Sequence, residues 1–336
     1  MKRRTLHRLL LSLMLTVSAV AVTLAPTTAA HADTYPPVTF LMQKEGSDYC
    51  LEARNDGSVT SGRCSHPQTV ARQRIQVVRY PGTSYVYLVS AATGNCVFPS
   101  GYGTDAGTPM VQTSCGDASA KHWTMQRSSL QHENEYSVQF INRKSGRCLR
   151  QPRLGDTPDL GGSCSNWYLT PTGYNYTFRP LSSAKCLDVD TWPDGGRQHG
   201  ARIQQWTCLG AGQANQLWNI EVQTLPGFNG GFRPAEVMLH PQHNPTACLV
   251  HQQFHWNGAL IEQNSCGIDS AWRFYPVDLA PENQAFKLDA LHLHAAPPMC
   301  LDVKNAALVD GTAVQLMQCD AAFQPSQRWR VVRVSP

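Results

Sequence analysis

Short segments in which apolar and polar residues alternate recur along most of the chain. In residues 136–140 (Tyr-Ser-Val-Gln-Phe) and 174–178 (Tyr-Asn-Tyr-Thr-Phe), every second side chain is apolar or aromatic. Such alternation is typical of half-buried β-strands. No stretch shows convincing helical periodicity, and the 25 glycines and 22 prolines interrupt the chain too often for long helices. The pattern predicts an all-β protein made of many short strands.

A local pattern of about 50 residues is repeated six times, and such a period indicates a repeat architecture. Each copy has a first cysteine followed by Leu or Val, a turn, a second cysteine, and then a strand with an apolar first position. The cysteine pairs of repeats one to six are Cys50 and Cys64, Cys96 and Cys115, Cys148 and Cys164, Cys186 and Cys208, Cys248 and Cys266, and Cys300 and Cys319. The apolar strand positions are Ile75, Trp123, Trp167, Trp218, Trp272 and Trp329.

Residues 1–32 have the features of a secretory signal peptide, with a basic start, an apolar middle at residues 9–24 and a small-x-small site at residues 30–32. Four of the 28 Lys and Arg residues and none of the 24 acidic residues lie in this segment, so the rest of the chain has no formal net charge. This argues against sequence-independent nucleic-acid binding, and no second apolar run is long enough to span a membrane. We therefore expect a secreted, extracellular protein.

The even number of cysteines in an exported chain predicts six disulfides, one within each repeat. The competing interpretation is metal ligation, but the chain contains no Cys-x-x-Cys motif. Histidines are concentrated in repeat five and near residue 293, where solvated loop histidines are more common than ligands without a His-Glu-x-x-His motif. These histidines are His240, His243, His251, His255, His292 and His294. We expect no metal and no cofactor.

Residues 33–336 are more than one small core usually covers, so two domains of three repeats each are expected. The junction is placed at Pro171-Thr172-Gly173. The expected organisation is a signal peptide at residues 1–32, a first domain at 33–172 and a second domain at 173–336.

Repeat four contains Cys-Leu-Asp-Val at residues 186–189, Gln-Gln-Trp-Thr-Cys at 204–208 and Asn-Gln-Leu-Trp at 215–218. In this order the motifs resemble those of ricin-type β-trefoil lectin domains, and repeat six resembles them next best. The resemblance is strong in the second half of the chain and rests on the cysteine framework in the first. It implies two tandem β-trefoils, the first degenerate, and a sugar site in a repeat that keeps the full motif set.

Only repeat four keeps that set. A sugar ring presents hydroxyls on its edge and C–H groups on its face, so a binding site needs a carboxylate, amides and a flat aromatic ring. Asp188 supplies the carboxylate, Trp206 the ring, and Gln204, Asn215 and Gln216 the amides. Each has another possible role: Asp188 could accept turn amides, Trp206 could be an ordinary strand aromatic, and Gln216 could brace its own loop. From the sequence, loss of Asp188 or of Trp206 should affect binding and little else.

The other repeats depart from the motif set. Repeat six keeps Asp302, Gln315 and Gln327 as a weak second site, but Met317 replaces the aromatic ring and Ser326 replaces the Asn. The residues at the Asp and aromatic positions elsewhere are Glu52 and Gly62, Phe98 and Thr113, Arg150 and Gly162, and Val250 and Asn264. Repeat four also has an insertion at Trp192-Pro193-Asp194, which could add an aromatic wall or close the pocket.

Candidate carboxylate pairs for glycoside hydrolysis are Asp188 with Asp190 or Asp194, and Glu133 with Glu135, but none stands in a recognisable catalytic motif. We therefore expect a non-catalytic lectin whose partner is a galactoside, a xylan or a related polysaccharide. One alternative is a glycan-anchoring subunit of a multi-chain toxin or adhesin, with the first domain bound to a second protein chain. Another is a β-trefoil hydrolase inhibitor that acts through a protruding loop. The sequence does not distinguish the sugar or the partner.

Overall fold

The computed structural model describes the chain from Pro36 to Val334 with several gaps. The described ranges are residues 36–64, 71–128, 137–153, 155–192, 195–196, 199–223, 236–251, 256–278, 284–290, 297–320 and 324–334. They all belong to one unit, Tyr35–Pro336. The expected signal peptide lies outside the described residues. Within them, no helix has the length and apolar character needed to cross a bilayer.

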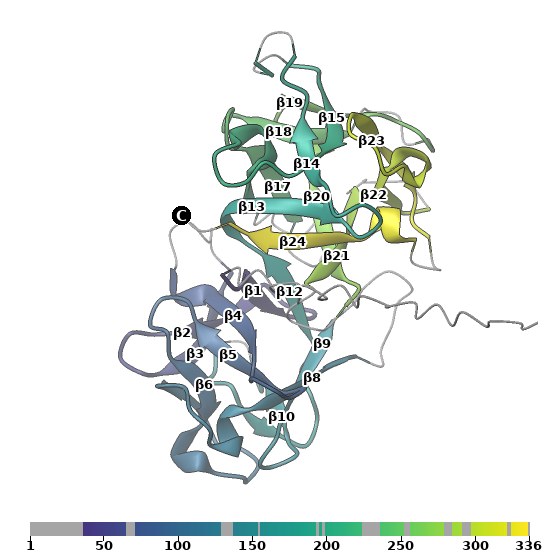
Figure 1. The fold of residues 1–336 in the computed structure, drawn as a ribbon. Coiled ribbons are helices and arrows are strands. Elements are labelled where there is room, and N and C mark those ends of the chain that lie inside the picture. Colours follow the sequence, from purple (N-terminus) through teal and green to yellow (C-terminus); the bar gives the residue numbers. More distant parts are fainter. Residues whose placement is uncertain are drawn as a thin grey trace, which may run out of the picture. The chain divides into compact units, whose positions relative to one another are not determined.

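The described residues form twenty-four strands, which Figure 1 draws as arrows. The strands of the N-terminal half are β1 (Thr39–Lys44), β2 (Tyr49–Ala53), β3 (Val59–Arg63), β4 (Arg74–Arg79), β5 (Val86–Ser90), β6 (Cys96–Pro99), β7 (Met110–Thr113), β8 (Trp123–Arg127), β9 (Val138–Asn142), β10 (Cys148–Arg150), β11 (Asp159–Gly161) and β12 (Trp167–Pro171). Those of the C-terminal half are β13 (Gly173–Pro180), β14 (Cys186–Val189), β15 (Ala201–Trp206), β16 (Trp218–Gln223), β17 (Glu236–Pro241), β18 (Ala247–His251), β19 (Ile261–Ser265), β20 (Trp272–Pro276), β21 (Ala285–Ala290), β22 (Met299–Val303), β23 (Thr312–Gln318) and β24 (Trp329–Arg333).

Helical structure in the described residues is limited to three-residue 3-10 turns, so the all-β prediction is confirmed. These turns are η1 (Ala71–Gln73), η2 (Ser100–Tyr102), η3 (Ser119–Lys121), η4 (Ala214–Gln216), η6 (Ile268–Ser270), η7 (Lys304–Ala306) and η8 (Pro325–Gln327). Of the two alternating segments, residues 138–140 of the first lie in β9 and the whole of the second, 174–178, lies in β13.

The strands form two 12-stranded antiparallel sheets, one from β1–β12 and one from β13–β24. Each sheet contains three repeats, and the chain passes from one sheet to the other between Pro171 and Gly173. This is the arrangement expected of two tandem β-trefoils, and the change of sheet coincides with the sequence junction.

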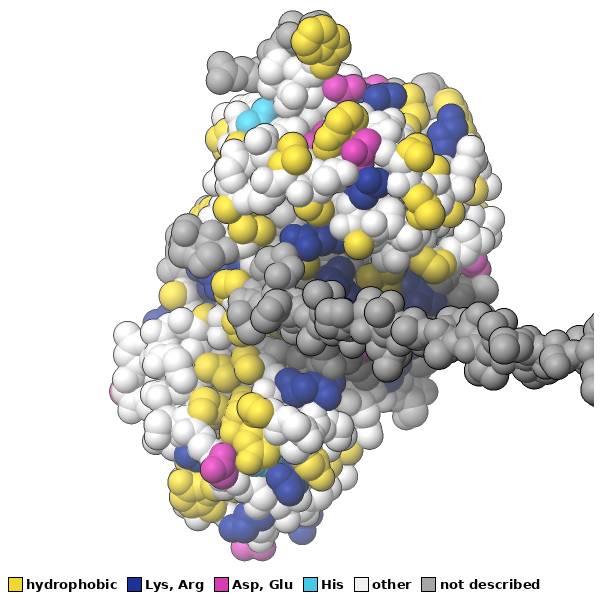
Figure 2. Space-filling model, viewed as in Figure 1, with side chains coloured by type: hydrophobic (Ala, Val, Ile, Leu, Met, Phe, Trp, Pro, Cys, Tyr) yellow, Lys and Arg dark blue, Asp and Glu magenta, His cyan; other side chains and the backbone are white. Residues whose placement is uncertain are grey.

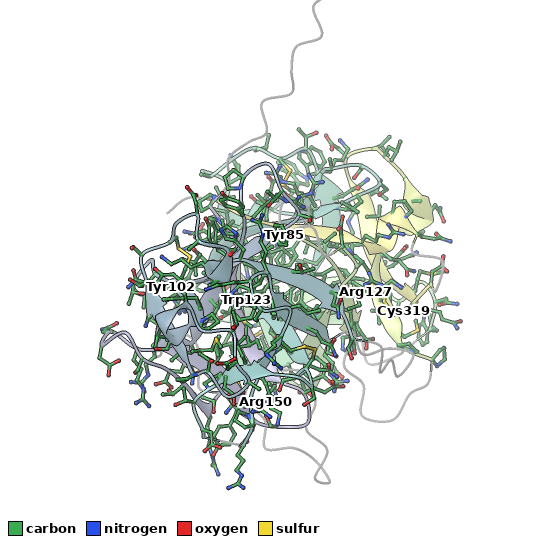
Figure 3. All side chains as sticks on the ribbon, turned by 90° about the horizontal axis from the view of Figure 1, so that it is seen from below. Tyr85, Tyr102, Trp123, Arg127, Arg150 and Cys319 are labelled. Carbon is green, nitrogen blue, oxygen red and sulfur yellow. A yellow bond between two sulfur atoms is a disulfide. The ribbon has the colours of Figure 1, made fainter. Side chains whose placement is uncertain are left out.

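Each repeat is built around the residue that follows its first cysteine. These residues are fully buried: Leu51, Val97, Leu149, Leu187, Leu249 and Leu301. In four repeats the strand tryptophan is also fully buried and donates its indole N–H to the carbonyl oxygen of that residue. The donor and acceptor pairs are Trp123 with Val97 (3.0 Å; Trp123 is labelled in Figure 3), Trp218 with Leu187 (3.1 Å), Trp272 with Leu249 (2.9 Å) and Trp329 with Leu301 (2.9 Å). The recurrent apolar position is therefore a core position, as the repeat pattern predicts.

A second recurrent contact joins each of four repeats to a loop of another repeat. In repeat four, Gln205 Nε2 donates to the carbonyl oxygens of Ala307 (2.7 Å) and Val309 (3.0 Å) in repeat six. Three equivalent residues, each opposite the core residue of its repeat, do the same: Ser61 Oγ donates to Asp156 O, Gln112 Nε2 to Arg54 O, and Gln263 Nε2 to Gly196 O. We call Ser61, Gln112, Gln205 and Gln263 the clasp residues. They tie repeat one to three, two to one, four to six, and five to four.

The structure contains all six predicted disulfides, each within one repeat. They join Cys50 to Cys64, Cys96 to Cys115, Cys148 to Cys164, Cys186 to Cys208, Cys248 to Cys266, and Cys300 to Cys319. We expect peptide mapping of the non-reduced protein to recover these six links and no link between repeats. Each should stabilise the fold by roughly 3 kcal/mol, because it restricts the unfolded chain. A link between two repeats would contradict the repeat alignment.

Candidate functional site

Asp188 lies at the centre of a network of side-chain amides in repeat four. It stands on β14 directly opposite Gln204 on β15, and Gln204 Nε2 donates to its Oδ1 (3.0 Å). The 3-10 turn η4 brings two more amides to Oδ2, from Asn215 Nδ2 (2.9 Å) and Gln216 Nε2 (3.0 Å). Four of the five predicted site residues therefore meet at one carboxylate.

Most of the hydrogen-bonding capacity of the Asp188 carboxylate is taken up by side chains of the protein. The residue is 4% exposed, and its two oxygens accept three hydrogen bonds from about four available positions. Burial raises the pKa of the Asp188 carboxyl above its usual value, and the bonds from Gln204 and Gln216 oppose that rise. One acceptor position, on Oδ1, remains for a ligand hydroxyl.

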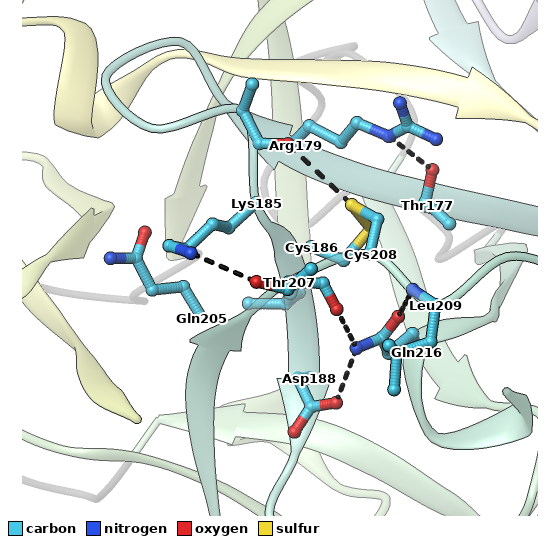
Figure 4. The surroundings of a disulfide bond; sticks show 12 residues. Thr177, Arg179, Lys185, Cys186, Asp188, Gln205, Thr207, Cys208, Leu209 and Gln216 are labelled. Atoms are coloured by element: carbon cyan, nitrogen blue, oxygen red, sulfur yellow. Dashed lines mark hydrogen bonds between the residues drawn. A yellow bond between two sulfur atoms is a disulfide. The ribbon is translucent and has the colours of Figure 1, made fainter. Parts of the chain in front are cut away.

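Gln216 is the deepest of the three amides, at 1% exposure. Its Nε2 also donates to the carbonyl oxygen of Thr207 (3.0 Å), and its Oε1 accepts from the backbone N–H of Leu209 (2.9 Å), as Figure 4 shows. Both polar ends of the side chain are therefore bonded to protein. Of the two roles that the sequence allows, this geometry favours bracing of the loop over direct contact with a ligand.

Asn215 is only partly buried and lies nearer the surface. Its Nδ2 donates to Asp188 and also to the carbonyl oxygen of Val189 (3.1 Å), so both amide hydrogens are used. The group that Asn215 can offer to a ligand is its side-chain carbonyl oxygen, which accepts a hydroxyl proton.

Trp206 ends β15 and is 38% exposed. Its ring lies beside Gly311 of repeat six, where an added Cβ would stand 3.6 Å from Cζ3. The following residue, Thr207, donates its backbone N–H to Asp310 Oδ1 (2.7 Å), and Lys185 Nζ pairs with the same oxygen (2.6 Å). In Figure 2, hydrophobic, acidic and basic side chains lie together on the face where Figure 1 labels β14 and β15. The exposed ring is thus positioned by a loop of another repeat.

The sequence interpretation did not include Arg202 in the site. Arg202 Nη2 donates to Gln204 Oε1 (3.0 Å) and to Asp190 Oδ2 (3.2 Å), and so extends the network to the surface. The signal was present, because alternate residues of a strand share a face and Arg202, Gln204 and Trp206 alternate along β15. Asp190, considered above as a catalytic partner of Asp188, is instead paired with Arg202.

The insertion of repeat four carries the most exposed aromatic side chain among the described residues, Trp192, at 85% exposure. Its backbone N–H donates to Asp190 Oδ1 (3.2 Å). Pro193 and Asp194 lie outside the described residues. The structure therefore places an exposed aromatic side chain two residues after Asp190, which pairs with Arg202.

Repeat six repeats the buried part of this network. Gln315 Nε2 donates to Asp302 Oδ1 (3.2 Å) and Ser326 Oγ to Oδ2 (2.9 Å), while Gln327 braces its loop through Gln318 O (3.1 Å) and Asp320 N (2.8 Å). Ser326 is buried, and Met317 stands where Trp206 stands in repeat four. The Asp and Gln residues are therefore a shared framework, and repeat four differs in its exposed ring and its Asn.

In the first half of the chain, the positions equivalent to Asp188 are occupied by side chains with partners of their own. Glu52 pairs with Arg54 and Arg72 (2.9 Å each), and Arg150, labelled in Figure 3, pairs with Asp159 (2.7 Å). At Phe98, Lys121 Nζ lies 5.4 Å from the ring centroid and donates to Ser114 O (2.6 Å), the same place that Gln216 takes in repeat four. In the second half of the chain, repeat five has the apolar residue Val250 at the position equivalent to Asp188.

One cluster of metal-binding residue types occurs among the described residues, formed by His240, Cys248 and Cys266. The two cysteines are joined as a disulfide in this structure. Of the other histidines, His251 is buried and His243 contacts Gly196 O (2.9 Å). His255, His292 and His294, and the acidic pair Glu133 and Glu135, lie outside the described residues.

No curated protein matches the chain in sequence. Three solved structures illustrate what it is similar to. A designed three-fold symmetric protein, ThreeFoil, is 28% identical over 48% of this chain and 99% of its own, with a TM-score of 0.38. The Macrolepiota procera ricin B-like lectin in complex with lactose is 16% identical over 49% and 98%, with a TM-score of 0.36. The agglutinin from Abrus precatorius is 16% identical over 89% and 98%, with a TM-score of 0.32.

Because these TM-scores are low, the assignment rests on a family model. The model described as "Ricin-type beta-trefoil lectin domain-like" matches residues 71–159, 129–206 and 163–229, three overlapping segments that span the change of sheet. The resemblance found in the sequence is thereby confirmed, and it supports a carbohydrate-binding role. From residue 71 to residue 229, therefore, the chain carries ricin-type β-trefoil lectin-like domains.

Proposed function

We propose that this chain is a secreted, non-catalytic lectin that binds galactose- or xylose-type glycans through repeat four. The observation that supports this most directly is the combination of an exposed Trp206 ring with the ordered carboxylate of Asp188 beside it. Every other repeat lacks at least one of these two groups at the equivalent positions.

The remaining bonding capacity of the site fits the edge of a sugar ring. The C–H face of the sugar stacks on Trp206, where aromatic contact is most effective. Two sugar hydroxyls donate to Asp188 Oδ1 and to the side-chain oxygen of Asn215. The second hydrogen of Gln204 Nε2 is available to a sugar oxygen. Gln216 keeps the loop in place and does not touch the sugar.

The same geometry disfavours glycoside hydrolysis. Hydrolysis needs two carboxylates on either side of the scissile bond, one of them free to transfer a proton. Asp188 is held by three amides, and Asp190 is paired with Arg202. Neither carboxylate is placed as a mobile acid or base, so retention of the intact glycan is the expected outcome.

The direct test is a glycan array with the full chain, followed by calorimetric titration with galactose, xylose and their oligosaccharides. We expect signals for galactosides or xylans, and a binding stoichiometry of one site per chain. Absence of any glycan signal, or release of reducing sugar from a bound glycan, would contradict the proposal.

Replacing Trp206 by Ala should weaken glycan binding by about 1 to 3 kcal/mol, roughly 5- to 150-fold, because the stacking surface is lost. The melting temperature should hardly change, because the ring is partly exposed and lies outside the core. The matched control is Met317→Ala, at the equivalent position of repeat six, which should leave affinity unchanged. Full binding by Trp206→Ala would place the sugar site elsewhere.

A further inference from the structure

His240 lies against one of the six disulfides. Its Nδ1 is 3.7 Å from Cys248 Sγ and 3.8 Å from Cys266 Sγ. One ligand atom from each of the three residues lies within 4.8 Å of the others. Among the described residues, no other disulfide sulfur has a histidine nitrogen at such a distance. The contact therefore distinguishes the disulfide of repeat five.

The opposite nitrogen of the same ring faces a carboxylate. His240 Nε2 is 3.2 Å from Glu221 Oε2, on the neighbouring strand β16. In zinc sites, a ligating histidine commonly donates its second ring N–H to a carboxylate, which fixes the tautomer and orients the ring. In repeat five the carboxylate contacts Nε2, the Cys266 sulfur lies near Nδ1, and the Cys248 sulfur lies near both ring nitrogens, 3.9 Å from Nε2. The imidazole therefore already has a carboxylate partner and two sulfurs within reach.

The two cysteines of this disulfide differ in how far they are buried. Cys248 is fully buried, whereas Cys266 is an exposed residue, as Cys115 is in repeat two, so solvent reaches the chain at the Cys266 end of the bond. Exposed disulfides are the more readily reduced class. Reduction would leave two thiols beside His240 Nδ1, which now contacts the carbonyl oxygen of Ala247 (2.9 Å). A metal bound at Nδ1 would replace that contact.

We propose that the Cys248–Cys266 disulfide is a redox-dependent zinc site, closed in the oxidised chain and formed by Cys248, Cys266 and His240 after reduction. An external dithiol supplies two electrons and two protons. The S–S bond breaks, two protein thiols form, and the dithiol becomes a disulfide. Zn²⁺ then displaces both thiol protons and binds two thiolates and Nδ1. Water completes the four-coordinate geometry that zinc prefers with such ligands.

Repeat four provides an internal control for this site. Arg179 precedes Pro180 on β13 as His240 precedes Pro241 on β17, so an arginine takes the place of the histidine. Arg179 Nε donates to Thr177 Oγ1 (3.2 Å), close to the Cys186–Cys208 disulfide in Figure 4. A guanidinium cannot bind zinc. The two disulfides therefore differ in their capacity for a third ligand.

The experiment begins with stepwise reduction of the folded full chain by a water-soluble phosphine, which yields the same two thiols. Alkylation and peptide mapping then report which pair opens. We expect Cys248 and Cys266 to open before Cys186 and Cys208. After anaerobic removal of the phosphine, Zn²⁺ alone should bind with one ion per chain and protect both cysteines from alkylation. Co²⁺ in its place should show the absorption of a tetrahedral thiolate site.

Single substitutions distinguish loss of a zinc ligand from loss of the fold. Glu221→Gln should weaken zinc affinity by about 10- to 100-fold, the usual effect of losing such a partner, and His240→Ala by more. Arg179→Ala should have no effect. The proposal is overturned if this pair opens no earlier than Cys186–Cys208, or if His240→Ala keeps wild-type zinc affinity. Zinc binding that appears only after the β-sheet circular dichroism is lost would equally overturn it.

Discussion

Replacing Trp218 by Ala should lower the free energy of unfolding by about 3 to 5 kcal/mol. The side chain is fully buried in the core of repeat four, and its indole N–H donates to the carbonyl oxygen of Leu187 (3.1 Å). Truncation opens a large void and leaves that carbonyl without its partner. Chemical denaturation, followed by fluorescence or circular dichroism, measures the change.

Two control variants are informative. One separates the effect of lost buried volume from that of the lost hydrogen bond, and the other compares a core tryptophan with a surface tryptophan. Trp218→Phe keeps most of the buried volume but leaves the Leu187 carbonyl unpaired, so it should cost about 1 to 3 kcal/mol. Trp206→Ala should cost little. If Trp206→Ala destabilised the protein as much as Trp218→Ala did, the assignment of one tryptophan to the core and the other to the surface would be wrong.

Asp188→Ala should both abolish measurable glycan binding and lower the free energy of unfolding by about 3 kcal/mol. The sequence alone suggested an effect on binding only. In the structure, the carboxylate accepts three amide bonds while 4% exposed, so its removal leaves buried donors unpaired. Unpaired buried donors cost about 1 to 3 kcal/mol each, and the second bonds of Asn215 and Gln216 reduce the total.

Asp302→Ala is the matched control, because Asp302 centres the same buried framework in repeat six without an exposed ring beside it. It should lower stability to a similar degree and leave glycan affinity at its wild-type value. Measuring melting curves and glycan affinity for both variants separates the framework from the binding site. Loss of binding in Asp302→Ala with wild-type binding in Asp188→Ala would move the site to repeat six.

The fold could be predicted from the sequence because its determinants are local and repeated. Alternation predicts the strands, and the cysteine spacing predicts the disulfides. The recurrence of an apolar residue at the position of Trp218 in every repeat predicts a core position. Each of these signals lies within one repeat, where residues that are close in the sequence are also close in space.

The site could be predicted only in part, because several of its contacts involve backbone atoms or distant residues. The roles of Gln216 depend on the carbonyl of Thr207 and the N–H of Leu209, groups that nearly every residue type supplies. Asp310 contacts Thr207 from 103 positions away. Repeat two has Lys121 beside Phe98 where repeat four has Gln216 beside Asp188. Such paired differences are equally hard to predict from the sequence, because each residue depends on another residue of its repeat.

The clasp residues also limit how far the binding function can be separated from the rest of the chain. Gln205 holds the segment that leads to Asp310 and Gly311. Asp310 bonds to Thr207, the residue after Trp206, and Gly311 lies beside the Trp206 ring. A minimal peptide containing repeat four alone would lack one side of its own pocket, and transplanting its motifs into another scaffold would fail unless the partner loop were transplanted too. Under the proposed function, repeat six, which has no exposed ring of its own, therefore completes the site of repeat four.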